Sequence, residues 1–278
     1  MIEEFIRIMT TYAFMQRALI ASILMGLIVG IVGTVMILRG LSLMGDAIGH
    51  SVLPGVAMSH LLGVPHVMGA AAFGLLASLL IGFITDKTTL KKDTVLGLVF
   101  SSFFALGIVM IAQIRTMTDL NHILFGNILT IGQADVVNLM WLAVIVILLV
   151  MLFYKELLLT SFDETTAKVY GIKTKVIHYV FLFVLTIVIV LSLQIVGVIL
   201  IVAMMITPAA TAYLLTKRMY TMLIVSTLLS VSASVMGIFL SLKLNVSAGS
   251  TIVLTSFFIF LLTFVLAPKK GLVSQFLK

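Results

Sequence analysis

The sequence predicts an all-α integral membrane protein, a polytopic bundle of eight to nine transmembrane helices. Hydrophobic residues make up 62% of the 278 residues and charged residues only 10%, whereas a soluble domain is about half apolar and a quarter charged. Apolar runs of about 20 residues, the length that crosses a bilayer, recur along the whole chain. The absence of cysteine excludes disulfides and thiolate metal sites.

Short polar or charged segments separate the predicted spans. We expect spans at 18–38, 42–62, 67–85, 94–113, 134–154, 177–195, 196–216, 221–242 and 250–267. The boundary near residue 196 is the least marked, because Gln194 and Gly197 are the only interruption in a long apolar run. A single crossing over 177–216 would give eight spans instead of nine.

The distribution of basic residues favours nine spans. If the loop with Arg39 is cytoplasmic, the alternate loops and the C-terminal tail carry 13 of the 17 basic residues, as the positive-inside rule requires. The net charge of +7 then reflects contact with the lipid of the inner leaflet, and no nucleic-acid partner is expected. We therefore expect a multi-pass membrane protein whose basic loops face the cytoplasm.

A single transmembrane domain over residues 1–278 is expected, with two short helices outside the spans. Residues 1–17 mix charged and apolar side chains, which predicts an amphipathic helix at the membrane interface. Residues 161–172 lie in a cytoplasmic loop, where Ser161 or Asp163 can cap a helix and Gly171 can end it. That helix could dock on a cytosolic partner or be an ordinary loop helix.

A charged pair lies inside the second predicted span. Asp46 and His50 are four residues apart, so they lie one turn apart on one face of a helix. An ionised carboxylate in the bilayer centre costs about 2.5–3.5 kcal/mol even on the lenient insertion scale, which favours a functional role. Counted from Arg39 at about 1.5 Å per residue, Asp46 lies about 10 Å deep and His50 about 16 Å deep.

A carboxylate and an imidazole together suit a divalent ion such as manganese, zinc or iron. Two ligands are few for a selective site, and a symmetric homodimer would double them. Pro54 has no N–H, so the His50 carbonyl loses its helical hydrogen bond and could face an ion. Two alternatives stay open: the pair could relay protons, or it could simply hold the bundle together.

Other polar and helix-breaking residues are weaker candidates. Histidines 60, 66, 122 and 178 are expected near interfaces, solvated or hydrogen-bonded. In the seventh span Pro208 frees the Met204 carbonyl, which predicts a kink that is either static or part of a gate; Met204 and Met205 are expected to pack. The outer segment 121–129, with Phe125, is too short to span and could be re-entrant or interfacial.

Two motifs are absent from the sequence. No Gly-x-x-x-x-Gly-Lys-Ser/Thr occurs, so the chain cannot cradle ATP in the P-loop manner, and ATP-dependent transport would need a separate motor chain. No His-Glu-x-x-His occurs either, which argues against an intramembrane zinc protease. We therefore expect a transport subunit and not an enzyme.

Four segments in order carry a resemblance to a known family. They are Gly45-Asp46 followed by His50-Ser51-Val52-Leu53-Pro54-Gly55-Val56-Ala57; Leu124-Phe125-Gly126; Asp163-Glu164 with Ala167 and Gly171; and Val196-Gly197-Val198-Ile199-Leu200 running to Pro208-Ala209-Ala210-Thr211-Ala212. In these segments, over nearly its whole length, the chain resembles the membrane permeases of zinc and manganese ABC importers, which have the type II importer architecture.

The resemblance implies a homodimer around one translocation path in the inner (plasma) membrane of a bacterium, with cytosolic ABC ATPase subunits below and an extracellular metal-binding lipoprotein above. It implies that Asp46 and His50 coordinate the transported metal. It also implies that the coupling helix docked on the ATPase includes Asp163, Glu164, Ala167 and Gly171. The Leu53-Pro54-Gly55 sequence looks more like the manganese members than the zinc members.

The expected cargo is therefore Mn²⁺, with Zn²⁺ or iron as the alternative within the same class. No cofactor is expected to be bound permanently, and ATP belongs to the partner subunit. Pro54, Pro208 and Phe125 are candidates for gating or helix breaks. Two other functions remain: a proton-coupled secondary metal carrier without an ATPase, and a membrane scaffold in which the charged pair is structural.

Overall fold

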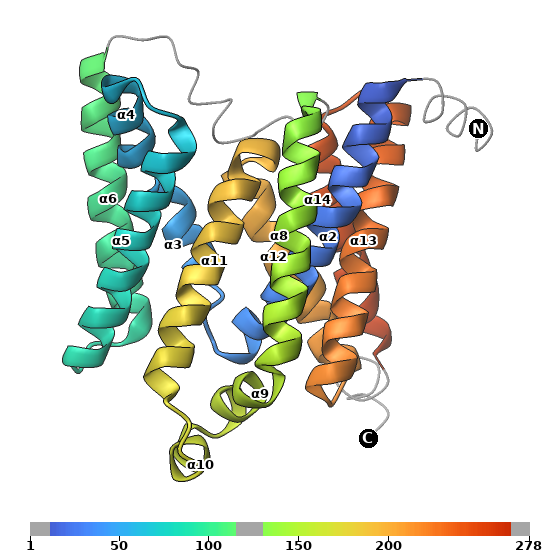
Figure 1. The fold of residues 1–278 in the computed structure, drawn as a ribbon. Helices are drawn as coiled ribbons and strands as arrows, with labels where there is room; N and C mark the ends of the chain where they lie inside the picture. Colours follow the sequence, from blue (N-terminus) through green and yellow to red (C-terminus); the bar gives the residue numbers. More distant parts are fainter. Residues whose placement is uncertain (1–11, 115–129, 268–278) are drawn as a thin grey trace.

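The described part of the chain, residues 12–114 and 130–267 of the computed structural model, is one helical bundle. Its helices are α2 (Ala13–Leu38), α3 (Met44–Ser51), α4 (Leu53–Leu62), α5 (His66–Lys87), α6 (Lys92–Ile114), α8 (Gln133–Leu152), α9 (Tyr154–Phe162), α10 (Glu164–Val169), α11 (Thr174–Val196), α12 (Val198–Leu215), α13 (Met219–Leu244) and α14 (Ala248–Leu266). Helices α3 to α6 form one side, α2, α8, α13 and α14 the other, and α11 lies between them (Figure 1).

Seven of the described helices are long and apolar enough to cross a membrane: α2, α5, α6, α8, α11, α13 and α14. The predicted count of eight to nine is slightly too high for continuous helices of that length. The second predicted span is divided at Val52 into α3 and α4, each too short to cross alone, because Pro54 starts a new helix. The seventh is α12, whose apolar stretch Leu200–Leu215 is shorter than the other spans.

The chain also divides where the sequence marks its least distinct boundary. Helix α11 ends at Val196 and α12 begins at Val198. Gly197 between them has φ 81° and ψ 161°, a conformation essentially restricted to glycine. The alternative of one continuous crossing over 177–216 is therefore wrong.

Basic residues of alternate connections share one end of the bundle. They are Arg39 after α2, Lys91 before α6, Lys155, Lys168 and Lys173 between α8 and α11, and Lys217 and Arg218 before α13. Helices α9 and α10 lie at this end, at the bottom of Figure 1. The positive-inside rule makes it the cytoplasmic end.

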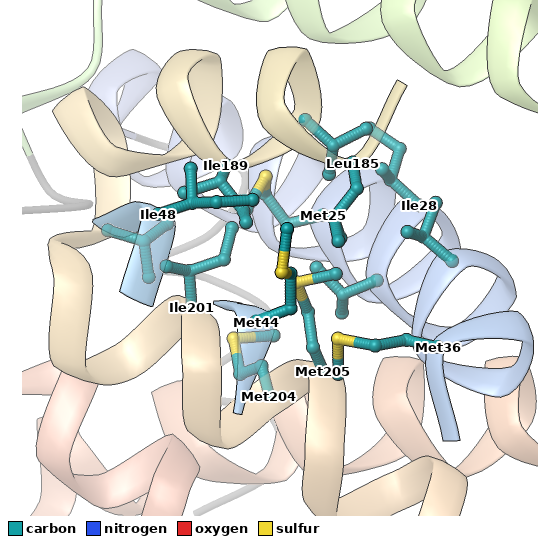
Figure 2. Close-up of a cluster of buried hydrophobic side chains, with 14 of the residues drawn as sticks. Met25, Ile28, Met36, Met44, Ile48, Leu185, Ile189, Ile201, Met204 and Met205 are labelled. Carbon is teal, nitrogen blue, oxygen red and sulfur yellow. The ribbon is translucent and has the colours of Figure 1, made fainter. Parts of the chain in front are cut away.

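Methionine and branched side chains fill the core where α2, α3, α11 and α12 meet (Figure 2). The labelled residues, each at most 2% exposed, are Met25, Ile28 and Met36 of α2, Met44 and Ile48 of α3, Leu185 and Ile189 of α11, and Ile201, Met204 and Met205 of α12. Met204 and Met205 pack in this core, as the sequence predicts. Unbranched methionine fills irregular gaps, which suits a junction of four helices.

Glycines of α2 allow close contact with its neighbours. A Cβ added at Gly30 would lie 2.6 Å from the Cα of Thr227 on α13, and one added at Gly33 would lie 2.1 Å from the Met205 carbonyl oxygen on α12. These contacts make α2 a central helix against which α12 and α13 pack. Of the predicted interfacial helix 1–17, residues 1–11 lie outside the described residues, and Ala13 to Arg17 belong to α2.

Candidate functional site

Asp46 and His50 lie on α3, in its first and last turn. The Asp46 Oδ1 and His50 Nε2 atoms are 3.4 Å apart. The His50 side chain is 18% exposed and the Asp46 side chain is 51% exposed. The structure thus brings the two predicted residues together, with the imidazole turned inward and the carboxylate half open to the surface of the single chain.

Two aromatic rings of α6 enclose the imidazole. Phe100 and Phe104 meet the His50 ring edge to face, with centroids at 5.3 and 5.4 Å. His50 Nδ1 and the neighbouring Ser51 Oγ are buried and have no hydrogen-bond partner within the described chain. Buried polar atoms without partners cost about 1–3 kcal/mol each, so an additional group bound here would be stabilising.

Small residues set the orientation of α3. Gly45 and Gly49 face α12: a Cβ at Gly49 would lie 2.7 Å from the Val198 Cγ1 atom. Each glycine precedes Asp46 or His50 by one residue, and consecutive residues lie about 100° apart around a helix. The glycine face therefore lies against α12, while the His50 ring is turned toward Phe100 and Phe104 of α6.

The two donor atoms suit a shared metal ion. Metal–ligand bonds of about 2.1 Å place neighbouring octahedral positions about 3 Å apart, close to the observed separation. Among the described residues, no cluster of three or more His, Asp or Glu side chains could hold a metal ion. Within residues 12–114 and 130–267, one chain offers two side-chain donors here, fewer than a complete coordination shell requires.

Pro54 lies at the interruption between α3 and α4. It is buried, and α6 approaches it closely at Gly107, where an added Cβ would lie 3.1 Å from the Pro54 Cδ. The His50 carbonyl, predicted to be free, accepts a local hydrogen bond from the Val52 N–H. Pro208 is buried inside α12, which remains helical around it.

The remaining histidines lie apart from this pair. His60 and His66 are exposed near the α4–α5 connection, with parallel rings at a centroid distance of 6.0 Å. His178 lies near the cytoplasmic start of α11, where it lines a polar cavity of about 240 Å³. His122 and Phe125 lie outside the described residues.

The predicted cytoplasmic helix is shorter than 161–172. Residues 161 and 162 end α9, and α10 covers Glu164–Val169. Asp163 caps α10 by accepting a hydrogen bond from the Thr166 N–H at 3.0 Å, and the Thr165 and Thr166 hydroxyls donate to the same carboxylate. These hydrogen bonds lower the pKa of Asp163 to about 2.

The end of α10 is equally well defined. Gly171 has φ 76°, and the Ile172 N–H donates to the Ala167 carbonyl at 3.0 Å, which is the pattern of a glycine-terminated helix. Ala167 is fully buried, and Glu164 accepts from Lys168 at 2.8 Å and from the Thr174 hydroxyl at 3.2 Å. The hydrogen bond with Lys168 is the main reason that the pKa of Glu164 is lowered.

Apolar side chains border α10 on its cytoplasmic surface. Phe162, Val169 and Tyr170 are 63%, 87% and 74% exposed. A short capped helix with such a surface is the kind of element that docks into a groove of a partner protein.

Comparison with known proteins identifies the family. The family model described as the ABC 3 transport family matches residues 11–267. This chain belongs to the ABC 3 transport family. As a member of that family, it is a multi-pass membrane transport subunit of the bacterial plasma membrane and not an enzyme.

Individual ABC 3 relatives match over almost the whole chain. It is 50% identical to the manganese import system permease protein ScaB of Streptococcus gordonii, over 97% of each chain. It is 48% identical to the manganese transport system membrane protein MntC of Listeria monocytogenes, over 94% of this chain and 93% of that one. The solved structure of PsaBC from Streptococcus pneumoniae in complex with Fab matches with a TM-score of 0.88 and 47% identity, over 99% of each chain.

Three residues at the sites of this ABC 3 permease carry no distinctive signal in the sequence. Phe100 and Phe104 enclose His50, but the chain has 18 phenylalanines and nothing in the sequence distinguishes these two. In the sequence Arg39 indicates only membrane orientation, whereas the structure partly buries it against α9 and α11. The only sign of a further role for Arg39 in the sequence is that it lies seven residues before Asp46.

Proposed function

We propose that this chain is the pore-forming permease of an ATP-dependent importer of divalent manganese. The carboxylate–imidazole pair of Asp46 and His50, 3.4 Å apart within the membrane segment, is the observation that carries the proposal. Oxygen and nitrogen donors together suit manganese, and relatives that are 48–50% identical are named manganese permeases. Zinc and iron are less supported, although the same donors also bind them.

The Asp46 side chain supports a homodimer. Half of it is exposed in the single chain, and a carboxylate at this depth is not stable against lipid. A second copy related by a twofold axis would cover the carboxylate and supply a second Asp46 and His50. Four side-chain ligands in a water-accessible path between two permeases would complete a site that one chain leaves incomplete.

ATP hydrolysis belongs to a separate cytosolic subunit in this proposal. The chain has no P-loop, whereas α10 presents Phe162, Val169 and Tyr170 to the cytoplasm. Asp163, Glu164, Ala167 and Gly171 hold α10 in shape as the coupling helix that docks on the ATPase. An extracellular metal-binding lipoprotein would deliver the ion at the opposite end of the bundle.

Transport would proceed by alternating access. Metal released at the outer face reaches Asp46 and His50 when the dimer opens outward, and ATP-dependent movement of α10 then opens the cytoplasmic side. Pro54, Pro208 and Phe125 are the proposed points of gating or helix bending. Of these three residues Pro54 is the nearest in sequence to Asp46 and His50, and it is buried against Gly107 of α6.

Vesicle transport separates this function from a secondary carrier. The purified permease is reconstituted alone or with its ATPase, and Mn²⁺ accumulation is measured with and without ATP. Accumulation only with both the ATPase and ATP is expected. Mn²⁺ flux through the permease alone, coupled to a proton gradient, would instead support the secondary carrier, and an absence of flux under every condition would support a scaffold.

A further inference from the structure

Arg39 connects the cytoplasmic end of α2 to the helix that carries the metal pair. It is the C-cap of α2, and Gly40 turns the chain with φ 63°. Backbone hydrogen bonds from Gly40 to Ile37 and from Leu41 to Met36, 3.1 and 3.0 Å long, close this turn. Asp46 follows Arg39 by seven residues, and only a short connection separates α2 from α3. Movement of this turn therefore displaces α3.

The guanidinium group of Arg39 binds the end of α9. Its Nε donates to Ser161 Oγ at 3.4 Å, and its Nη2 donates to Thr160 Oγ1. Both hydroxyls use their own protons within α9: Thr160 donates to the Glu156 carbonyl at 2.7 Å and Ser161 to the Leu157 carbonyl at 2.6 Å. Their oxygens are therefore presented to the guanidinium as acceptors.

Two further groups interact with Arg39. Its guanidinium carbon lies 5.2 Å from the centre of the Phe181 ring on α11. Burial lowers the pKa of Arg39 to about 10, and the negative charge of Glu164 on α10 partly offsets this effect. Arg39 thus remains charged at neutral pH and interacts with groups from three helices.

A cavity leaves room for this contact to change. The polar cavity of about 240 Å³ is lined by Arg39, Lys92, Thr160, Ser161, Glu164 and His178, among others. A close-packed interior resists displacement of its side chains, whereas a cavity beside the half-buried Arg39 allows the end of α9 to shift. Helix α10 begins three residues after Ser161, so displacement of α10 acts directly on the Arg39 contact.

We propose that Arg39 is a positioning residue that couples movement of α10 to α3, and so links ATP hydrolysis to the exposure of Asp46 and His50. This role rests on the proposed importer function. Lysine keeps the positive charge but lacks the planar set of donors that reaches two hydroxyls at once. A role limited to membrane orientation would therefore be retained by lysine, whereas the coupling role would not.

The test uses the assembled transporter in vesicles and measures Mn²⁺ transported per ATP hydrolysed. Two variants break the contact from opposite sides: Arg39→Lys, and Thr160→Val with Ser161→Ala. Thr88→Val is the matched control, because Thr88 is the C-cap of α5 and its hydroxyl donates to the Ile84 carbonyl at 2.8 Å, four residues earlier, as the Thr160 hydroxyl does to Glu156. Coupling between sites is typically worth about 5–150-fold, and we expect a decrease of about tenfold in both variants and none in the control.

Two companion measurements make the result specific. Mn²⁺ bound per complex should be unchanged, because Arg39 does not contact the metal pair. In the variant that combines all three substitutions, Mn²⁺ transported per ATP should fall no further than in Arg39→Lys alone, because both sets of changes remove the same contact. If the two decreases multiply, the proposal is overturned. A transport ratio within about twofold of wild type in both variants would also overturn it.

Failure of this inference is distinguishable from failure of the proposed function. A wild-type complex that transports no Mn²⁺ rejects the importer function and, with it, this role of Arg39. A wild-type complex that transports Mn²⁺, with variants that do so equally per ATP, rejects the role of Arg39 alone. If the Arg39→Lys complex does not assemble, the variant with Thr160→Val and Ser161→Ala tests the role of Arg39 by the same measurement, Mn²⁺ transported per ATP hydrolysed.

Discussion

Gly107 of α6 lies directly against Pro54 of α4, so closely that an added Cβ would be 3.1 Å from the proline Cδ and 2.7 Å from the Leu53 Cβ. Gly107 shares a helix face with Phe104 and Phe100, which lie three and seven residues before it. These phenylalanines enclose His50. The contact therefore connects the break after α3 to the aromatic surroundings of the imidazole.

Gly107→Ala is expected to destabilise this contact and lower Mn²⁺ uptake. Overpacking of a close helix contact costs about 1–3 kcal/mol of unfolding free energy, and displacement of α6 would move Phe100 and Phe104 away from His50. The measurements are the Tm of the purified permease and Mn²⁺ uptake. Gly97→Ala, on the same helix with open space at the Cβ position, is the control and should leave both unchanged or raise the Tm.

Gly197→Ala is expected to lower the Tm and to reduce uptake as well. A side chain in the φ and ψ of Gly197 costs about 1–3 kcal/mol, and relief of that strain would move Val198. Val198 lies against Gly49, the residue before His50, so the position of α3 depends on it. A Tm equal to that of wild type would show that the break between α11 and α12 does not need glycine.

Asp163→Ala is expected to reduce Mn²⁺ transported per ATP several-fold, because α10 loses its N-cap. Asp163→Asn keeps a side-chain acceptor and should lie between Ala and wild type. The pKa of Asp163 in the folded protein, about 2, lies below the usual value of 3.8. The charged cap therefore stabilises α10 above about pH 4, and this stabilisation is lost only as the pH falls through 2.

The lowered pKa of Asp163 keeps its carboxylate ionised throughout the neutral pH range, which provides a control. The effect of Asp163→Asn should be the same at pH 6 and pH 8, since the wild-type carboxylate is ionised at both. A transport ratio that differs between wild type and Asp163→Asn only at the higher pH would contradict the assignment of Asp163 as a permanently charged cap.

Much of the fold could be predicted from the sequence because the bilayer constrains it. Apolar length and basic loops place the spans to within a few residues: 94–113 is predicted where α6 covers Lys92–Ile114. The Asp46 and His50 pair could be found because a four-residue spacing in an apolar span needs no tertiary information.

Other features depend on contacts between distant segments. The enclosure of His50 by Phe100 and Phe104 requires the relative rotation of α3 and α6, which the sequence does not encode because the apolar residues of α6 surround that helix almost evenly. The binding of Arg39 by Thr160 and Ser161 joins residues more than 120 positions apart. The division at Val52 follows from Pro54, yet one proline is equally consistent with a kinked continuous helix.

Direct Mn²⁺ binding to the purified permease tests the central claim. Free Mn²⁺ is followed by its EPR signal during titration of wild type, of Asp46→Ala with His50→Ala, and of Asp86→Ala with His60→Ala as the matched control for residue type. Wild type and control should bind Mn²⁺, and the Asp46 and His50 variant should bind none while keeping the oligomeric state and Tm of wild type. Equal binding by that variant would contradict the assignment of the metal site.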